Sequence, residues 1–107
     1  MVVIVGYGGD EVGDAERLEA DLWDGIEESK RLGYNPTRFI QMVKQHGAVE
    51  ATRMAVDTRY PAQGFVKLAW DVEPRRPDLT SEQLVLNYPE LFSEDVVRKA
   101  RNRLGYQ

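Results

Sequence analysis

The sequence contains no cysteine and a single histidine, His46. Without cysteine, the chain can form neither a disulfide framework nor a thiolate metal site. A zinc site would have to be built mainly from carboxylates, so we predict no bound metal. The absence of cysteine is also typical of proteins of the reducing cytoplasm, and we predict a cytoplasmic location.

The side chains that serve as nucleophiles and general bases lack suitable neighbours in the sequence. His46 ends a predicted helix, where an imidazole interacts favourably with the carbonyl end of the helix dipole. Ser29 has no base near it, while Ser81 and Ser93 stand at predicted helix starts. We therefore expect no enzyme activity.

Long apolar runs are also missing, since the longest, Val2 to Val5, is far too short for a membrane span or a signal-peptide core. We predict no membrane segment. The chain has 107 residues, of which 42% are hydrophobic and 30% charged, as expected for one globular domain. We predict an N-terminal arm over residues 1–13 and a single helical domain over residues 14–107.

Charge is distributed unevenly along the chain. Residues 1–35 carry nine acidic and three basic side chains, whereas residues 36–107 carry eleven basic and nine acidic ones. The simplest interpretation is that these charges form the solvated faces of helices. Attraction between the acidic and basic parts, within the fold or between copies, is the alternative.

Helix start and stop signals dominate the sequence and predict a mainly α fold. Asp14 is a candidate N-cap for a helix that ends at Gly33, with apolar residues recurring every three or four positions. Asn35 and Pro36 begin a second predicted helix. Gly47 separates it from a third over residues 48–56. The predicted architecture is a compact bundle of about five helices with a short β-prone N-terminal arm.

The middle of the chain, residues 57–79, is interrupted by proline and glycine. Within it, residues 64–70 fit either a helix or a short strand, and we favour the helix. Thr80 and Gln83 then form a predicted capping box, and Ser93 is the predicted N-cap of a last helix. In that helix Val97, Ala100 and Leu104 are expected to face inward.

The glycines that follow the β-branched run resemble part of a dinucleotide-binding fingerprint. That fingerprint needs a third glycine at a fixed spacing, and counting from Gly6 and Gly8 the third position falls on Glu11. An acidic side chain there would repel a pyrophosphate. We therefore predict no cofactor, and we expect the first residues to form an edge strand, a dimer strand or a loose arm.

A series of short motifs runs in a familiar order from residue 32 onward. The motifs are residues 32–39 (LGYNPTRF), 42–43 (MV), 47–49 (GAV), 64–65 (GF), 78–86 (DLTSEQLVL), 91–92 (LF) and 100–104 (ARNRL). This order resembles a small bacterial domain family of no assigned function, found as short proteins and as a segment of longer ones. The resemblance covers about two-thirds of the chain. It implies an all-helical bacterial domain and brings no catalytic residues.

Two positions depart from the pattern of that family. Ala69 separates Leu68 from Trp70 where the family has a Leu-Trp pair, and Pro77 stands where the family has leucine. The middle segment is therefore expected to differ in shape.

The corner at Gly47 raises nucleic-acid binding as an alternative function. In a helix-turn-helix interpretation, Thr52 and Arg53 of the following helix would contact the nucleic acid. Arg98, Lys99 and Arg101 of the last helix would add phosphate contacts. The net charge of −4 and the position of Arg53, where an apolar residue is expected, weigh against this alternative.

Aromatic residues outside the main apolar stripes are candidate contacts for a protein partner. Trp23 falls beside the stripe of the first helix, and Tyr7 and Tyr60 lie in expected irregular regions. Trp23 could equally complete the core. Our leading hypothesis is a noncatalytic protein-interaction or accessory domain of a bacterial cytoplasmic protein, able to associate with an unknown partner or with itself.

Overall fold

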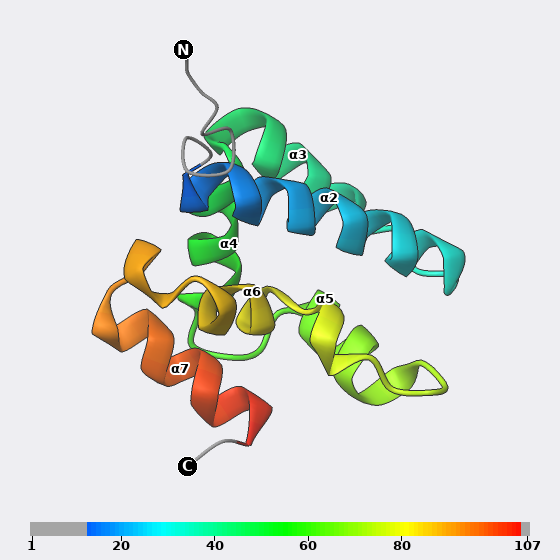
Figure 1. Ribbon diagram of the computed structural model, residues 1–107. Helices are drawn as coiled ribbons and strands as arrows, with labels where there is room; N and C mark the ends of the chain where they lie inside the picture. Colours follow the sequence, from blue (N-terminus) through cyan, green and yellow to red (C-terminus); the bar gives the residue numbers. More distant parts are fainter. Residues whose placement is uncertain (1–12, 106–107) are drawn as a thin grey trace.

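The computed structural model describes residues 13–105, and this part of the chain is built from helices and connecting turns (Figure 1). The α-helices are α2 (Asp14–Arg31), α3 (Thr37–His46), α4 (Ala48–Val56), α5 (Gln63–Val66), α6 (Ser81–Asn87) and α7 (Glu94–Leu104). A π-helix, η1 (Lys67–Asp71), continues α5, and the 3-10 turns η2 (Pro77–Leu79) and η3 (Pro89–Leu91) precede α6 and α7. The mainly α class is confirmed, with six α-helices in the described part where about five were expected.

Helix α2 buries one face and ends at a glycine. Its buried apolar residues are Leu18, Leu22 and Ile26. Gly33 has a φ of +93°, a conformation that costs little only for glycine, and this lets its neighbours close a Schellman motif on the last carbonyls of the helix. The predicted cap at Asp14 is wrong by one residue: Gly13 has extended dihedrals and is the N-cap, so Asp14 lies within the first turn.

Helices α3 and α4 meet at a sharp corner. Gly47 has a φ of +89° and serves as both the last cap of α3 and the first cap of α4. Helix α4 has the predicted bounds. Helix α3 begins at Thr37, because Pro36 has a ψ of 64° and therefore lies outside the helix as its N-cap.

The segment between α4 and α6 is helical over residues 64–70, for which the sequence fits either a helix or a strand. Phe65 of α5 and Leu68 of η1 are buried, and the ring of Trp70 packs edge-on against Phe65 with 5.6 Å between centroids. Trp70 itself is 54% exposed. The preference for helix over residues 64–70 is confirmed.

Side-chain caps start both later helices. The Thr80 hydroxyl accepts a hydrogen bond from the Gln83 amide, and the Ser93 hydroxyl accepts one from the Val96 amide. The predicted capping box is only half formed, because the Gln83 side chain donates to Asn87 instead of reaching back to Thr80. One turn of helix places these two amide side chains side by side.

The core consists of two clusters, and α4, which runs between α2 and α3 on one side and α6 and α7 on the other in Figure 1, contributes to both. The first contains Leu18, Leu22, Ile26, Val43, Ala48 and Ala51, and the second contains Val56, Val85, Val96 and Ala100. In α7 the buried residues are Val96 and Ala100, so the expectation that Val97 and Leu104 also face inward holds only in part, since both are half-buried. No helix within residues 13–105 is long and apolar enough to cross a membrane.

Candidate functional site

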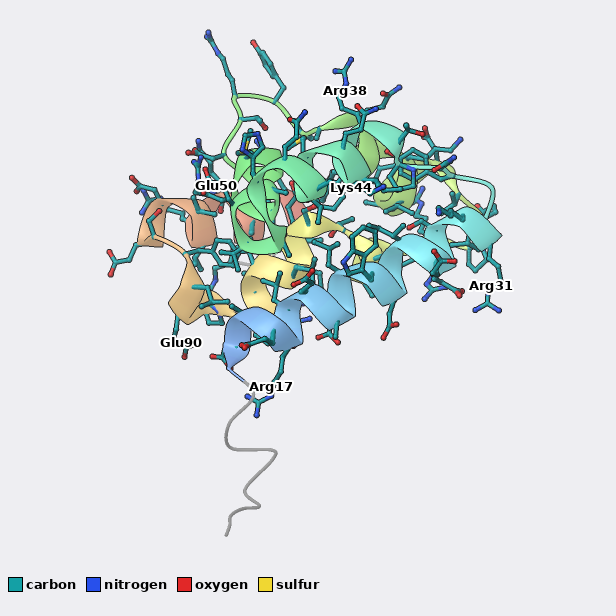
Figure 2. The ribbon with its side chains drawn as sticks, turned by 90° about the horizontal axis from the view of Figure 1, so that it is seen from above. Arg17, Arg31, Arg38, Lys44, Glu50 and Glu90 are labelled. Atoms are coloured by element: carbon teal, nitrogen blue, oxygen red, sulfur yellow. The ribbon has the colours of Figure 1, made fainter. Side chains whose placement is uncertain are left out.

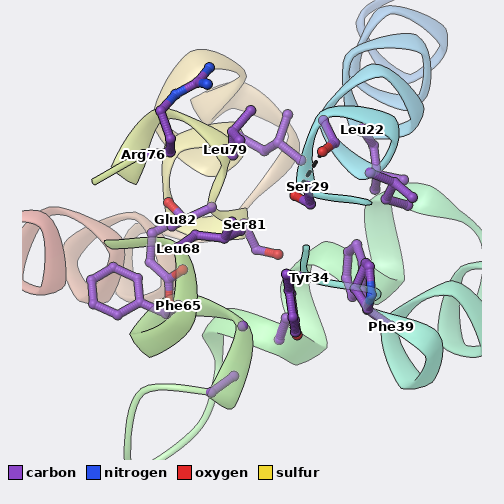
Figure 3. Close-up of a pocket in the computed structure, with 18 of the residues that line it drawn as sticks. Leu22, Ser29, Tyr34, Phe39, Phe65, Leu68, Arg76, Leu79, Ser81 and Glu82 are labelled. Carbon is purple, nitrogen blue, oxygen red and sulfur yellow. Dashed lines mark hydrogen bonds between the residues drawn. The ribbon is translucent and has the colours of Figure 1, made fainter. Parts of the chain in front are cut away.

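A cavity of about 750 Å³, called the cleft below, opens between two groups of helices. Figure 3 shows Tyr34 and Phe39 on one side of it and Leu68, Leu79 and Ser81 on the other. The first side belongs to α2, α3 and the turn between them. The second belongs to α5, η1, η2 and α6. The cleft is therefore built by segments that are far apart in the sequence.

Most of the surface that the cleft exposes is apolar. The larger apolar side chains that line it are Leu22, Ile26, Phe39, Met42, Met54, Phe65, Leu68, Leu79 and Leu84. Several of them, including Phe39, Met42 and Met54, are only half-buried. The volume lies in the range of about 300–1,000 Å³ that is usual for ligand sites, and such sites are mainly apolar with a few polar groups. The cleft is thus the best candidate binding site in the described part of the chain.

Gly25 lines the cleft from the interior of α2. A Cβ atom added there would make an ordinary contact with the Leu79 side chain, at 4.0 Å. Glycine inside a helix costs about 0.5–1 kcal/mol relative to alanine. Gly25 is not among the site residues predicted from the sequence. An isolated glycine within an amphipathic helical pattern is the signal that could have indicated this position.

Gly64 allows the Tyr34 side chain to approach α5. A Cβ atom at Gly64 would lie 3.2 Å from the Tyr34 hydroxyl, which is closer than an ordinary contact. Burial raises the pKa of Tyr34 above its usual value of 10.0. The hydroxyl therefore stays protonated at neutral pH and can donate a hydrogen bond to a ligand in the cleft.

Arg76 connects the rim of the cleft to α2. Its guanidinium lies 3.0 Å from the Asp78 carboxylate and 3.2 Å from the Glu28 carboxylate. Arg31, followed by Arg76, lowers the pKa of Glu28, and Arg76 lowers the pKa of Asp78. The Arg76 amide also donates to the Leu68 carbonyl, so the segment between η1 and η2 is held from both its backbone and its side chain.

A buried ion pair lies behind the α6 wall. The guanidinium of Arg103 is 3.1 Å from the Glu82 carboxylate, and it also donates to the backbone carbonyls of Val56 and Thr58. Burial raises the pKa of Glu82, and hydrogen bonding to Arg103 opposes that rise. A buried carboxylate is tolerated when a partner of this kind satisfies it.

Some polar groups around the cleft are already engaged by other groups of the fold. The Ser29 hydroxyl donates to the Gly25 carbonyl of its own helix, and Glu82 is held by Arg103. His46 is exposed at the end of α3 and does not line the cleft. Within residues 13–105, no group of three His, Cys, Asp or Glu side chains is placed to hold a metal ion.

The predicted partner contacts do not gather at one place. Trp23 is half-buried, packs against the first core cluster and donates from its indole nitrogen to Glu19 at 3.3 Å. Tyr60 is 71% exposed, with the Arg59 guanidinium 5.7 Å from the centre of its ring. Tyr7 lies outside the described residues. Neither Trp23 nor Tyr60 lines the cleft.

The predicted nucleic-acid contacts on α4 are occupied within the fold. Thr52 is 0% exposed and donates its hydroxyl hydrogen to the Ala48 carbonyl, so its assignment as a nucleic-acid contact is wrong. Packing of α4 against the core is the physical reason. Arg53 is accessible but is paired with both Glu50 and Asp57 of its own segment.

The basic residues of α7 are also divided among different partners. Arg98 pairs with Asp95 on the same helix, and the Lys99 ammonium lies 2.8 Å from the Asp57 carboxylate. Arg101 is exposed. Arg103 forms the buried ion pair with Glu82. The structure thus does not present these residues as one free basic surface.

No family model, no curated protein and no solved structure matches this chain. The function is therefore inferred from the cleft and from the residues around it.

Proposed function

We propose that this chain is a noncatalytic protein-interaction domain whose cleft receives apolar side chains of a partner protein. The observation that carries the proposal is the cleft itself, which has a volume of about 750 Å³ and a mainly apolar surface. Burying such a surface against a partner is favourable at about 25 cal/mol per Å² of apolar area removed from water. Half-buried apolar residues such as Phe39, Met42 and Met54 would supply that area.

The polar contacts of the cleft favour binding over catalysis. Arg76 is engaged by Glu28 and Asp78, and Glu82 is engaged by Arg103. A nucleophile needs a base within hydrogen-bond reach, and the Ser29 hydroxyl instead donates to a carbonyl of its own helix. These contacts make the rim rigid, and a rigid binding surface loses less entropy when a partner docks.

The test uses Gly25→Leu, which fills the cleft from the α2 side. Its matched control is Ala20→Leu, which adds the same side chain at an exposed position of α2 outside the cleft. Peptides are selected from a displayed random library on the wild-type protein and are then measured against both variants. We expect apolar-anchored peptides that bind the wild type and Ala20→Leu and lose affinity for Gly25→Leu. Selection of no binder, or binders indifferent to Gly25→Leu, would contradict the proposal.

Two further measurements separate the related hypotheses. Sedimentation over a wide range of concentration tests whether the partner is a second copy, and a monomer throughout excludes self-association. Binding of DNA or RNA at low salt, lost in Arg98→Glu/Arg101→Glu, would favour the nucleic-acid alternative. The bacterial origin and the cytoplasmic location stay predictions.

A further inference from the structure

We infer that the partner segment in the cleft is an amphipathic helix that carries basic residues beside its apolar face. This inference rests on the proposed function and adds the chemistry of the occupant. It is carried by the charge at the rim of the cleft and by the helical spacing of that charge.

Acidic side chains outnumber basic ones around the cleft. The acidic residues that line it are Asp21, Asp24, Glu28, Asp78 and Glu82, and the basic ones are Arg38 and Arg76. Arg103, behind the wall, neutralises Glu82. With Arg103 counted, the acids still exceed the bases, and the excess favours a cationic partner. Arg38 lines the cleft from α3 and is included in this count, and its side chain extends outward in Figure 2.

The acidic excess lies on α2. Glu28 is paired with Arg31 and Arg76, whereas neither Asp21 nor Asp24 forms an ion pair with any residue in the range 13–105. Asp21 accepts a hydrogen bond from the Tyr88 hydroxyl, which keeps its carboxylate oriented. Two carboxylates on an exposed helix edge are thus available to a partner.

The spacing of these carboxylates matches that of a second helix. Asp21, Asp24 and Glu28 are three and four residues apart, so they line one edge of α2 over about 10 Å. A helix lying along the cleft repeats its side chains with the same period. Its apolar residues would enter the cleft while its lysines or arginines face Asp21 and Asp24.

The structure offers no support for the other occupants of the cleft that we considered, an extended peptide and a second copy of the chain. An extended peptide usually adds a strand to an exposed sheet edge, and the region from residue 13 to residue 105 contains no strand. A second folded copy is also a poor occupant. The basic helix α7 buries its own apolar residues, Val96 and Ala100, in the second core cluster. A helix of another protein is therefore favoured.

The experiment compares two labelled synthetic peptides of about four helical turns, with leucines at i, i+3, i+4 and i+7. One carries lysine beside the leucines and the other carries glutamate. Fluorescence anisotropy is expected to show binding of the lysine peptide to the wild-type protein and several-fold weaker binding of the glutamate peptide. Raising the salt concentration should weaken the binding of the lysine peptide only.

Variants locate the effect on the protein. Asp21→Asn/Asp24→Asn should lower the affinity for the lysine peptide by about three- to tenfold, as expected for the loss of two exposed ion pairs. The control Glu16→Gln/Glu27→Gln changes the net charge of α2 equally, at exposed positions that do not line the cleft. It should leave the affinity unchanged.

The outcomes distinguish this inference from the proposed function. If both peptides bind equally well and Gly25→Leu abolishes both, the charge inference is wrong and the cleft is still a binding site. If both pairs of acidic variants weaken the lysine peptide equally, only net charge matters and the inference is again wrong. If neither peptide binds the wild type, the inference fails, and the library selection decides the proposed function. If a peptide binds and Gly25→Leu has no effect on it, both fail.

Discussion

Arg103 of α7 lies 3.1 Å from Glu82 of α6, and the two side chains are only 10% and 2% exposed. The same guanidinium donates to the Val56 and Thr58 carbonyls at the end of α4. One side chain thus joins α4, α6 and α7 behind the wall of the cleft. Without Arg103, the buried Glu82 carboxylate would lose its partner, and the Val56 and Thr58 carbonyls would lose this donor.

Replacing Arg103 by methionine should be strongly destabilising. Removing one partner of a buried ion pair costs about 3–5 kcal/mol, because the other charge is left without compensation. Chemical denaturation measures the loss. The double variant Glu82→Met/Arg103→Met should recover most of it, since neither charge is then buried. A double variant no more stable than Arg103→Met would show that the backbone contacts of Arg103 matter more than the charge.

The Arg103→Met variant should also become more stable in mild acid. Burial raises the pKa of Glu82 above its ordinary value of 4.5, and the variant lacks the guanidinium that opposes this rise. The folded state then holds the proton more tightly than the unfolded state, so stability increases as the pH falls from neutral toward 4.5. Thermal melts at several pH values test this, and Glu82→Met/Arg103→Met should lose the dependence.

The Arg76 contacts should open in acid. Arg31 and then Arg76 lower the pKa of Glu28, and Arg76 lowers the pKa of Asp78, so the stability that these pairs provide is present above the ordinary values of 4.5 and 3.8. It is lost as the pH falls through the lowered values of the folded state. Fluorescence of Trp70 in a Trp23→Phe background should report the change.

Two variants assign that acid response to Arg76. Arg76→Gln should remove it and should raise amide hydrogen exchange in residues 67–79 at neutral pH. Arg31→Gln is the control, because Arg31 also pairs with Glu28 but forms no ion pair with that segment. An equal response in Arg31→Gln would exclude a specific role of Arg76 in holding the segment.

A glycine-to-alanine change should have opposite effects on stability at Gly25, which lies inside α2, and at Gly33, which follows its end. Gly25→Ala should stabilise the protein by about 0.5–1 kcal/mol, because it favours the helix and its Cβ makes an ordinary contact at 4.0 Å. Gly33→Ala should be destabilising by about 1 kcal/mol, because φ is +93° there. Urea denaturation compares the two, and destabilisation by Gly25→Ala would mean that the cleft is packed more tightly than its geometry indicates.

The two hydroxyl caps should differ in strength. Thr80 is 1% exposed, and its hydroxyl both accepts from the Gln83 amide and donates to the Pro77 carbonyl at 2.7 Å. Thr80→Ala should therefore cost about 1–2 kcal/mol, at the upper end for helix caps. Ser93 is exposed, and Ser93→Ala should cost about 0.5–1 kcal/mol. Equal losses in the free energy of unfolding would contradict a contribution from the burial of Thr80.

Local signals identified most of the helix boundaries. The glycines at 33 and 47 end helices as predicted, and the hydroxyls of Thr80 and Ser93 cap helices as predicted. These features act within one turn of backbone, so the residues that decide them are neighbours in the sequence. The errors at Asp14 and Pro36 are shifts of one residue, where two adjacent residues could each have served as the cap.

The cleft depends on contacts between residues that are far apart in the sequence, and the sequence pattern does not predict them. Arg76 pairs with Glu28 across 48 positions, and Arg103 reaches Val56 across 47. Thr52 was assigned to a surface because helical periodicity alone does not say which face of α4 packs inward.

The sequence by itself determined that this chain forms helices and where most of them begin and end, because capping and glycine dihedrals are local. Only the tertiary structure decided which faces α4 buries, where α2 and α6 leave a cleft, and which carboxylates stay unpaired at its rim. Those outcomes depend on how side chains far apart in the sequence fill the space between helices, and many sequences with the same local pattern would fill it differently.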